Sequence, residues 1–231
     1  MGKSFVVVGT DTGVGKTIVS AGLLFSYRVA GMEAGIQKWI STGDISGFSQ
    51  DVDFILNVAG ISRNFFPGIS DRHLNPFSFI YPASPHYSSK MHRKRIDLSE
   101  IKSLFQEYAS LMDILIVEGV GGVLVPLTQK VLLIDVIKDL DLPVLLVVKN
   151  TLGAINHSLL TIHVLRSRDI KILGLVFNDG FSCSIDIKKD NIKTISRLGK
   201  ITVLGQIPFM EDIRDYKVVF DGIRKGIDQR L

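Results

Sequence analysis

Cysteine is nearly absent from this chain of 231 residues, which contains only Cys183. An internal disulfide, a zinc cluster built on cysteines and a paired-cysteine redox centre are therefore excluded. No apolar run reaches the roughly 18 to 20 residues that span a bilayer, and the first residues resemble a strand rather than a secretory leader. We expect a cytoplasmic protein in a reducing compartment, without a membrane partner.

Charge of one sign is also scarce. The formal net charge is only +4, and no basic helix or basic-aromatic alternation accompanies it, so we expect no nucleic-acid partner. Hydrophobic residues make up 46% and charged residues 22% of the chain, which excludes a disordered protein. At this length, residues 1–231 suit a single α/β domain with a sizeable core.

A catalytic triad is missing as well. Neither His86 nor His157 has a Ser, Asp or Cys partner at a diagnostic spacing. A mechanism that relies on a protein nucleophile is therefore not indicated.

The most informative feature present is a glycine-rich turn. The apolar run SFVVV leads directly into GTDTGVGKT, which closes on Lys16 and Thr17 before a helical pattern begins. This layout is typical of a phosphate-binding loop, in which backbone N–H groups and a helix N-terminus surround a polyphosphate. Lys16 would reach the β- and γ-phosphates, and the Thr17 hydroxyl would bind Mg²⁺. The alternative is a β-turn with a stray lysine, but strand, loop and amphipathic continuation together favour nucleotide binding.

The spacing of this loop departs from the common G-x-x-x-x-G-K-[ST] pattern. Thr10 stands where the first glycine belongs, and Gly9 lies one residue earlier. Partition and septum-positioning ATPases carry a second lysine four residues before the last glycine, where this chain has Asp11. A close relationship to those proteins is therefore less favoured.

Apolar runs alternate with helical patterns along the chain. The runs are at 5–8, 34–37, 114–117, 144–148, 172–177 and 203–207, and the helical patterns at 16–30, 51–59, 98–110, 133–140, 156–168, 185–198 and about 216–225. This alternation predicts an α/β, P-loop NTPase-like fold with a mostly parallel sheet and helices on both faces. The proline-containing stretch 64–94 is expected to be a long irregular excursion.

Several polar side chains are predicted at the carboxyl ends of strands, where such sheets bind ligands. Glu118 in VEGVGG would serve Mg²⁺, unless it is simply a solvated acid in a turn. Lys38 would hold a second anion beside the γ-phosphate, although alone it reads as a surface lysine. Asp51 and Asp53 are both candidates to complete the metal shell, and their spacing does not choose between them.

Two later segments suggest a site for adenine. Asn178 ends a strand, where its amide would read the edge of the base, and the GQIPF segment provides a rigid backbone at Pro208. Turn chemistry explains both segments equally well.

Taken in order, these motifs resemble those of the dethiobiotin synthetase family. The matching segments are GTDTGVGKT, Lys38 with the following Ser-Thr-Gly, SPH, VEGVGG, LGAINH, the Asn-Asp pair and GQIPF, which together extend from Gly9 to about Phe209. The resemblance implies that 7,8-diaminopelargonate, CO₂ and ATP give dethiobiotin, ADP and phosphate, with Mg²⁺ as cofactor and ATP as co-substrate. It also implies a homodimer whose partner subunit receives the distal carboxylate of the substrate.

The resemblance further assigns roles by position in the motifs. Catalysis is implied for Lys16 and Lys38; metal binding for Thr17, Asp51 and Glu118; ATP binding for Thr12, Gly13, Val14, Gly15, Lys16, Thr17, Glu118, Asn178 and Pro208; and substrate binding for Thr42, Gly121, Gly153, Ala154, Ile155 and Asn156. Asp51 is preferred to Asp53 because it heads the family-like helix that ends near Gly60.

The chain also departs from the family pattern. Trp39 replaces the usual proline after Lys38, and Thr42 replaces a serine. One alternative is an ATP-dependent amidoligase of the cobyrinic acid type, which usually carries a glutaminase domain that does not fit this length. The other is a nucleotide-switch ATPase of the ParA or MinD kind, which would need the extra loop lysine.

Overall fold

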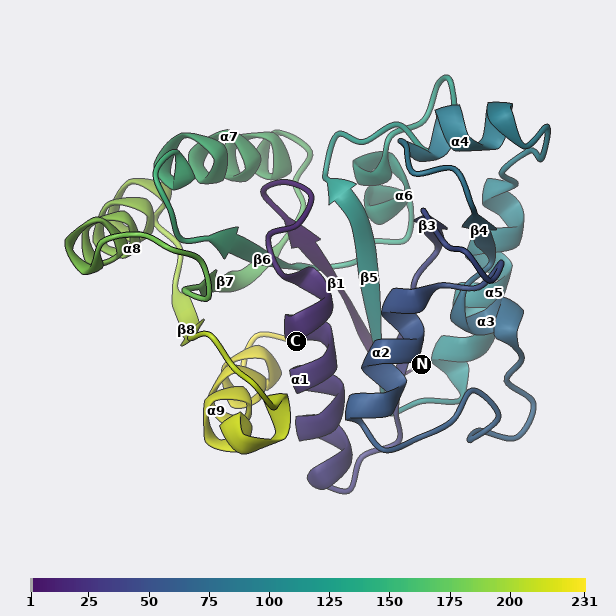
Figure 1. The fold of residues 1–231 in the computed structure, drawn as a ribbon, viewed down its shortest axis with the longest axis horizontal. Helices are drawn as coiled ribbons and strands as arrows, with labels where there is room; N and C mark the ends of the chain where they lie inside the picture. Colours follow the sequence, from purple (N-terminus) through teal and green to yellow (C-terminus); the bar gives the residue numbers. More distant parts are fainter. Residues whose placement is uncertain (1) are drawn as a thin grey trace.

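Six parallel strands form the central sheet of the computed structural model, which describes residues 2–231 (Figure 1). Their order across the sheet is β2-β5-β1-β6-β7-β8, and every neighbouring pair is parallel. The strands are β1 (Lys3–Gly9), β2 (Ala34–Gln37), β5 (Ile114–Gly122), β6 (Val144–Lys149), β7 (Ile172–Asn178) and β8 (Val203–Ile207). Because β1 lies inside this order, the loop that follows it opens in the interior of the carboxyl edge rather than at a flank.

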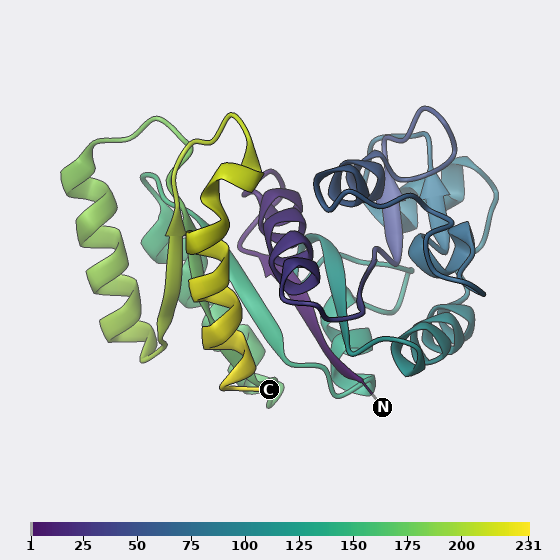
Figure 2. The same cartoon turned by 90° about the horizontal axis from the view of Figure 1, so that it is seen from below.

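Helices fill the connections between the strands. They are α1 (Lys16–Val29), α2 (Gln50–Val58), α5 (Leu98–Ser110), α6 (Leu133–Asp139), α7 (Ala154–Ser167), α8 (Ile185–Gly199) and α9 (Lys217–Asp228), the last preceded by the 3₁₀ turn η1 (Ile213–Tyr216). α1 packs against α2 and α9, and α7 packs against α8. Figure 2 shows α1 and α9 side by side. In the part of the chain described, no helix combines the length and apolar character needed to cross a membrane.

The central strands are buried along most of their length. In β1, residues 5–8 are at most 1% exposed, and the segments 114–117 of β5 and 144–148 of β6 are fully buried. A strand covered by helices on both faces has no solvent side, so its sequence is a continuous apolar run rather than an alternating one. The predicted α/β fold with a mostly parallel sheet is confirmed.

A second, smaller parallel sheet lies beside the main one. It pairs β3 (Ile40–Thr42) with β4 (Phe77–Phe79), and the short helices α3 (Asp71–Leu74) and α4 (Pro85–Met91) flank β4 in the chain. Figures 1 and 2 both place this segment to one side of the main sheet. The prediction of an irregular excursion over 64–94 is therefore wrong in part. These elements are too short to carry a periodic signal, and they are held by pairing between distant parts of the chain.

The position predicted for Glu118 also needs correction. The strand was expected to end at Val117, but β5 continues to Gly122. Val7 of β1 pairs with Glu118, and after a shift of register Gly9 pairs with Gly122. The glycine-rich segment thus extends the strand alongside the start of the phosphate loop, and Glu118 lies within the sheet, only 2% exposed.

Candidate functional site

The phosphate loop joins β1 to α1, and two of its positions require glycine for different reasons. Gly15 caps α1 with a φ of 103°, a left-handed conformation that costs glycine little. A Cβ on Gly9 would lie 2.7 Å from Cγ2 of Val14 and 2.8 Å from the carbonyl oxygen of Asp11, so the loop closes over a position that accepts no side chain. No side chain caps α1, which leaves its first N–H groups available to an anion.

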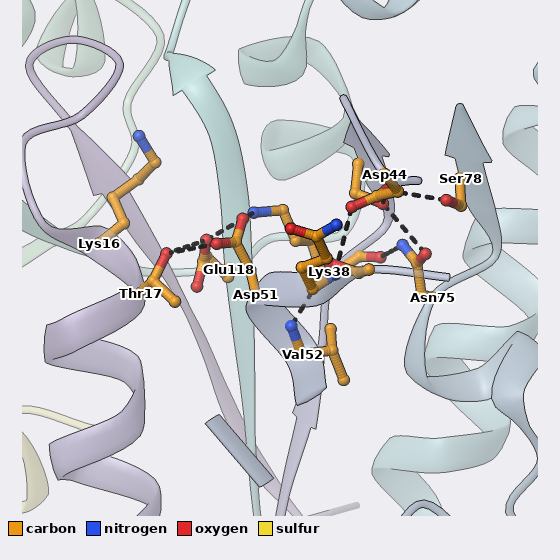
Figure 3. A network of polar contacts seen from close by, with 12 residues as sticks. Lys16, Thr17, Lys38, Asp44, Asp51, Val52, Asn75, Ser78 and Glu118 are labelled. Atoms are coloured by element: carbon orange, nitrogen blue, oxygen red, sulfur yellow. Dashed lines mark hydrogen bonds and ion pairs between the residues drawn. The ribbon is translucent and has the colours of Figure 1, made fainter. Parts of the chain in front are cut away.

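Lys16 lies at the start of α1, with its ammonium beside the phosphate loop (Figure 3). Its Nζ donates to the carbonyl oxygen of Asp11 at 3.1 Å. Burial lowers the pKa of Lys16 to about 8, although the nearby carboxylate of Glu118 opposes the shift. A bound anion would supply the counter-charge that this ammonium lacks. The geometry therefore suits a group that binds phosphate.

Lys38 directly follows β2, and its side-chain ammonium lies between two carboxylates. Its Nζ donates to Oε1 of Glu118 at 2.7 Å and also forms an ion pair with Asp51. Oγ1 of Thr17 lies 3.2 Å from Oδ1 of Asp51 and 3.1 Å from Oε1 of Glu118, and its single hydrogen can be donated to one of them at a time. Figure 3 shows these four side chains, here called the Lys38 cluster, meeting beside the phosphate loop.

Two opposing effects act on the pKa of Lys38 in this cluster. Burial alone lowers the pKa of Lys38, but the carboxylates of Glu118 and Asp51 outweigh burial and raise it. The side chains of Lys38 and Glu118 are 6% and 1% exposed, whereas that of Asp51 is 47% exposed. Lys38 is therefore a permanent cation, held in place by one buried acid and one acid that reaches solvent.

Trp39 does not displace Lys38 from the site. Its indole N–H donates to Oε1 of Gln37 at 2.9 Å, and its ring meets that of Phe105 edge-on, with 6.3 Å between centroids. The backbone N–H of Lys38 donates to the carbonyl oxygen of Leu74 at 2.8 Å. The residue that departs from the family pattern is thus packed away from the cavity, and Lys38 keeps its orientation toward Glu118.

The structure distinguishes Asp51 from Asp53, between which their spacing in the sequence did not choose. Asp51 belongs to the Lys38 cluster. Asp53 instead accepts from Nε of Arg63 at 2.7 Å, and that guanidinium stacks on Phe48 with 3.6 Å to the ring centroid. The two carboxylates point in different directions because neighbours two apart on a helix do not share a face. Asp51 is therefore the better placed of the two to serve a metal.

The donor set around Thr17 fits Mg²⁺. Oε2 of Glu118 is buried and has no hydrogen-bond partner among the described residues, so one hard oxygen is left for a cation. The ammonium of Lys38 already occupies a cationic position between Glu118 and Asp51. One hydroxyl and two carboxylates are the oxygen ligands that suit a Mg²⁺ ion retaining several waters. Within residues 2–231 no three His, Cys, Asp or Glu side chains gather as a metal site, so a metal here would depend on the hydroxyl.

Most of the predicted site residues line one cavity of about 490 Å³. Those that do so are Thr12, Gly13, Gly15, Lys16, Thr17, Lys38, Thr42, Asp51, Glu118, Gly121 and Asn178. Val14 is buried beneath the loop instead, at 1% exposed. The cavity thus brings both predicted lysines, the three predicted metal ligands and the hydroxyl of Thr42 together.

A smaller groove of about 200 Å³ shares Asn178, Phe181 and Ile18 with this cavity and is also lined by Pro208. Nδ2 of Asn178 donates to the carbonyl oxygen of Val14 at 3.0 Å, and Oδ1 accepts from the N–H of Gly180 at 3.0 Å. Each end of the amide keeps one further hydrogen-bonding position. The groove therefore has the partly apolar walls and the polar edge that a purine base requires.

Phe181 is a lining residue that the sequence reasoning missed. It lies three residues after Asn178, and the ammonium of Lys149 sits over its ring at 4.3 Å from the centroid. An aromatic residue just beyond a predicted carboxyl end of a strand was the available signal.

One group of predicted substrate residues lies outside the cavity. Gly153, Ala154, Ile155 and Asn156 form the start of α7, and none of them lines the cavity of the phosphate loop. No side chain caps this helix, and Leu152 before it is 85% exposed. Within one chain these residues are therefore not brought together with Lys38.

The sequence comparisons point in one direction. A family model described as an AAA domain matches residues 3–217. The ATP-dependent dethiobiotin synthetase of Methanococcus vannielii is 35% identical over 217 residues, covering 92% of this chain and 95% of the relative. That of Lysinibacillus sphaericus strain C3-41 is 37% identical over 215 residues, covering 92% and 90%.

A likeness to solved structures concerns the fold alone. The cell division ATPase MinD of Pyrococcus furiosus superposes with a TM-score of 0.60 over the full length of both chains, at 14% identity. In this chain Asp11 stands four residues before the last glycine of the loop, and its side chain accepts from the N–H of Thr12 at 2.7 Å. The shared architecture is a P-loop sheet with flanking helices.

Proposed function

The chain belongs to the family of ATP-dependent dethiobiotin synthetases, and we propose on this premise how its phosphate loop and Lys38 cluster share the steps of the reaction. Its activity is the ATP-dependent synthesis of dethiobiotin, a ligase reaction. The observation that carries the assignment of residues is that Lys16, Thr17, Lys38, Asp51 and Glu118 line one cavity.

The chemistry has three bond-forming steps. One amine of 7,8-diaminopelargonate attacks CO₂ and loses a proton, which gives a carbamate. A carbamate oxygen attacks the γ-phosphorus of ATP, the bond to the bridging oxygen breaks, and ADP leaves. The second amine then attacks the carbonyl carbon of the mixed anhydride, loses a proton and closes the ureido ring as phosphate departs. No step needs a protein nucleophile, so the enzyme acts by positioning and by charge.

Lys16 and the phosphate loop hold the nucleotide. The uncapped N-terminus of α1 and the loop N–H groups face the phosphates, and the ammonium of Lys16 offsets the charge that develops on the transferring phosphoryl group. Lys16 has no carboxylate within ion-pair distance among the described residues. Its charge is thus available in the ground state and in the transition state.

Lys38 acts on the carbamate. Two anions, the carbamate and the γ-phosphate, must approach one another, and a buried ammonium between them lowers their repulsion. Its raised pKa keeps Lys38 protonated while it does so. Thr42 lies on β3 and lines the same cavity, and its hydroxyl would donate to the carbamate.

Thr17, Asp51 and Glu118 would hold Mg²⁺. The metal, when bound, supplies positive charge to the β- and γ-phosphates. The adenine would enter the groove beside Asn178 and Pro208.

The proposal is tested by product stoichiometry. The protein receives 7,8-diaminopelargonate, bicarbonate and Mg·ATP, and the ureido product and phosphate are measured together. We expect one phosphate per dethiobiotin and little phosphate when the diamine is left out. Phosphate release without ureido product would contradict the assignment, and release stimulated by DNA or lipid would favour a switch ATPase.

We further propose that the active site is completed by a second copy of the chain. The start of α7 has no side-chain cap and no place in the cavity of its own chain, yet an uncapped helix N-terminus suits a carboxylate. In a homodimer, residues 153–156 of one subunit would receive the distal carboxylate of a substrate bound beside Lys38 of the other.

Mixing two impaired variants tests this arrangement. Asn156→Asp places a carboxylate in the exposed first turn of α7, where the helix tolerates it but the substrate carboxylate is repelled. We expect the KM for the diamine to rise about tenfold, a loss of about 1.4 kcal/mol. Mixed with Lys38→Ala and allowed to exchange subunits, it should recover about a quarter of wild-type activity at low substrate, because half the dimers hold one intact site. Activity equal to the mean of the two variants would show that each site lies within one chain.

A further inference from the structure

Asp44 is a buried carboxylate that the proposed reaction does not use. It is 5% exposed and follows Gly43 at the end of β3. In the described part of the chain no cationic side chain forms an ion pair with it, which is unusual because an isolated buried charge is costly. Neutral donors must therefore compensate its charge.

Three donors from three elements perform that compensation. Oδ1 of Asp44 accepts from the N–H of Gln50 at 3.2 Å, at the start of α2. Oδ2 accepts from Oγ of Ser78 on β4 at 2.8 Å, and also from Oγ of Ser41 on β3. The N-terminal end of α2 adds its favourable dipole. One carboxylate thus joins both strands of the small sheet to the first turn of a helix.

This junction leads to both partners of the ion pair in the active site. α2 carries Asp51, one residue beyond the N–H that Asp44 binds. On the other side, Nδ2 of Asn75 donates to the carbonyl oxygen of Lys38 at 2.7 Å. Oδ1 of Asn75 lies 3.1 Å from Oγ of Ser41, whose single hydrogen is donated either to this amide or to Asp44. Figure 3 shows this continuous row of polar contacts from Ser78 to Lys38.

We infer that Asp44 is a positioning residue, which fixes the distance between Lys38 and Asp51 by tying β3, β4 and α2 together. It does not line the phosphate cavity, so we expect it to contact neither nucleotide nor substrate. The inference rests on the proposed function, since a fixed separation matters only if Lys38 meets a reacting group. Displacing a reacting geometry by about 1 Å costs on the order of 100-fold in rate.

The test compares two substitutions at this position. Asp44→Ala removes all three hydrogen bonds. In Asp44→Asn, the amide oxygen can still accept from the N–H of Gln50, and the amide NH₂ can donate to the serine hydroxyls once these rotate to accept. We expect Asp44→Ala to lower kcat about 10- to 100-fold with less than about threefold change in the KM for ATP. Asp44→Asn should retain at least about a third of wild-type kcat.

Asp53→Ala is the matched control. It removes a first-turn carboxylate of α2 that pairs with Arg63 away from the cavity, and it should leave kcat close to wild type. A folded Asp44→Ala with wild-type kcat would overturn the inference. So would an Asp44→Asn as impaired as Asp44→Ala, or an equal loss in Asp53→Ala.

A second readout does not depend on turnover. The ¹⁵Nζ signal of the Lys38 ammonium, identified by its loss in Lys38→Ala, should exchange slowly in the wild type because two carboxylates hold it. Faster exchange is expected in Asp44→Ala, or in Ser78→Ala if the former does not fold. Unchanged exchange in the folded variant would contradict the positioning role. A wild-type enzyme that forms no dethiobiotin, by contrast, would refute the proposed function while leaving this signal to be measured.

Discussion

Replacing Lys38 by alanine should lower kcat by about 100-fold or more while the Kd for ATP changes by less than about threefold, because one transition-state charge contact is worth on the order of 3 kcal/mol. In the proposed mechanism Lys38 acts on the carbamate, whereas the phosphate loop and Lys16 hold the nucleotide, and all of them line the same cavity. Single-turnover phosphoryl transfer and equilibrium ATP binding measure the two effects separately.

The same variant should respond more strongly to Mg²⁺. Without the ammonium, the buried carboxylate of Glu118 loses its counter-charge, and breaking a buried pair costs about 3 to 5 kcal/mol. A divalent cation at this position would restore part of that loss, so we expect Mg²⁺ to raise the melting temperature of Lys38→Ala more than that of the wild type. Lys102→Ala, at a half-exposed lysine paired with Asp139, is the control.

For the first measurement on Lys38→Ala, equal losses in kcat and in ATP affinity would mean that Lys38 merely binds nucleotide.

Lys16→Ala should impair both binding and turnover. Among the described residues, its ammonium has the carbonyl oxygen of Asp11 as its one hydrogen-bond partner, so under the proposed function we expect it to contact the phosphates before and during transfer. We expect a loss of about 100- to 1,000-fold in kcat, which corresponds to about 3 to 4 kcal/mol. The Kd for ATP should rise about tenfold or more, because the ground state loses the same contact. Titration with ATP and steady-state kinetics measure the two quantities.

Lys3→Ala provides the comparison for this second variant. Lys3 is exposed at the first position of β1, at the end of that strand opposite to the phosphate loop, so its removal changes the net charge equally without reaching the cavity. An effect of the same size in both variants would point to net charge rather than to a phosphate contact. Unchanged ATP affinity in Lys16→Ala would contradict the loop's proposed role.

The elements of the main sheet were predictable because their signals are local. The runs at 5–8, 114–117 and 144–148 are continuous and apolar, as strands buried on both faces must be, and the helix at 98–110 has the predicted bounds. The strands β3 and β4 were missed because each spans three residues, and their pairing joins Ile40 to Phe77. No periodicity can appear in so short a segment.

The acidic residues of the site illustrate a second limit on prediction from the sequence. Spacing alone did not choose between Asp51 and Asp53, although the family resemblance preferred Asp51, and only the folded chain places Lys38 beside Asp51 and Arg63 beside Asp53. Glu118 lines the cavity of the phosphate loop, but its burial depended on the continuation of β5 through the glycines. The contacts of Asp44 had no signal in the sequence, because its donors come from three separate elements.

The sequence alone determined the alternating α/β elements, the phosphate loop and the family, since hydrophobic period, turn chemistry and motif order are properties of neighbouring residues. The tertiary structure decided which charges meet. Thr17 lies 34 positions from Asp51 and 101 from Glu118, and these side chains converge only because β5 pairs with β1 and α2 packs on α1. Such contacts follow from the order of strands and the packing of helices, which no local pattern encodes.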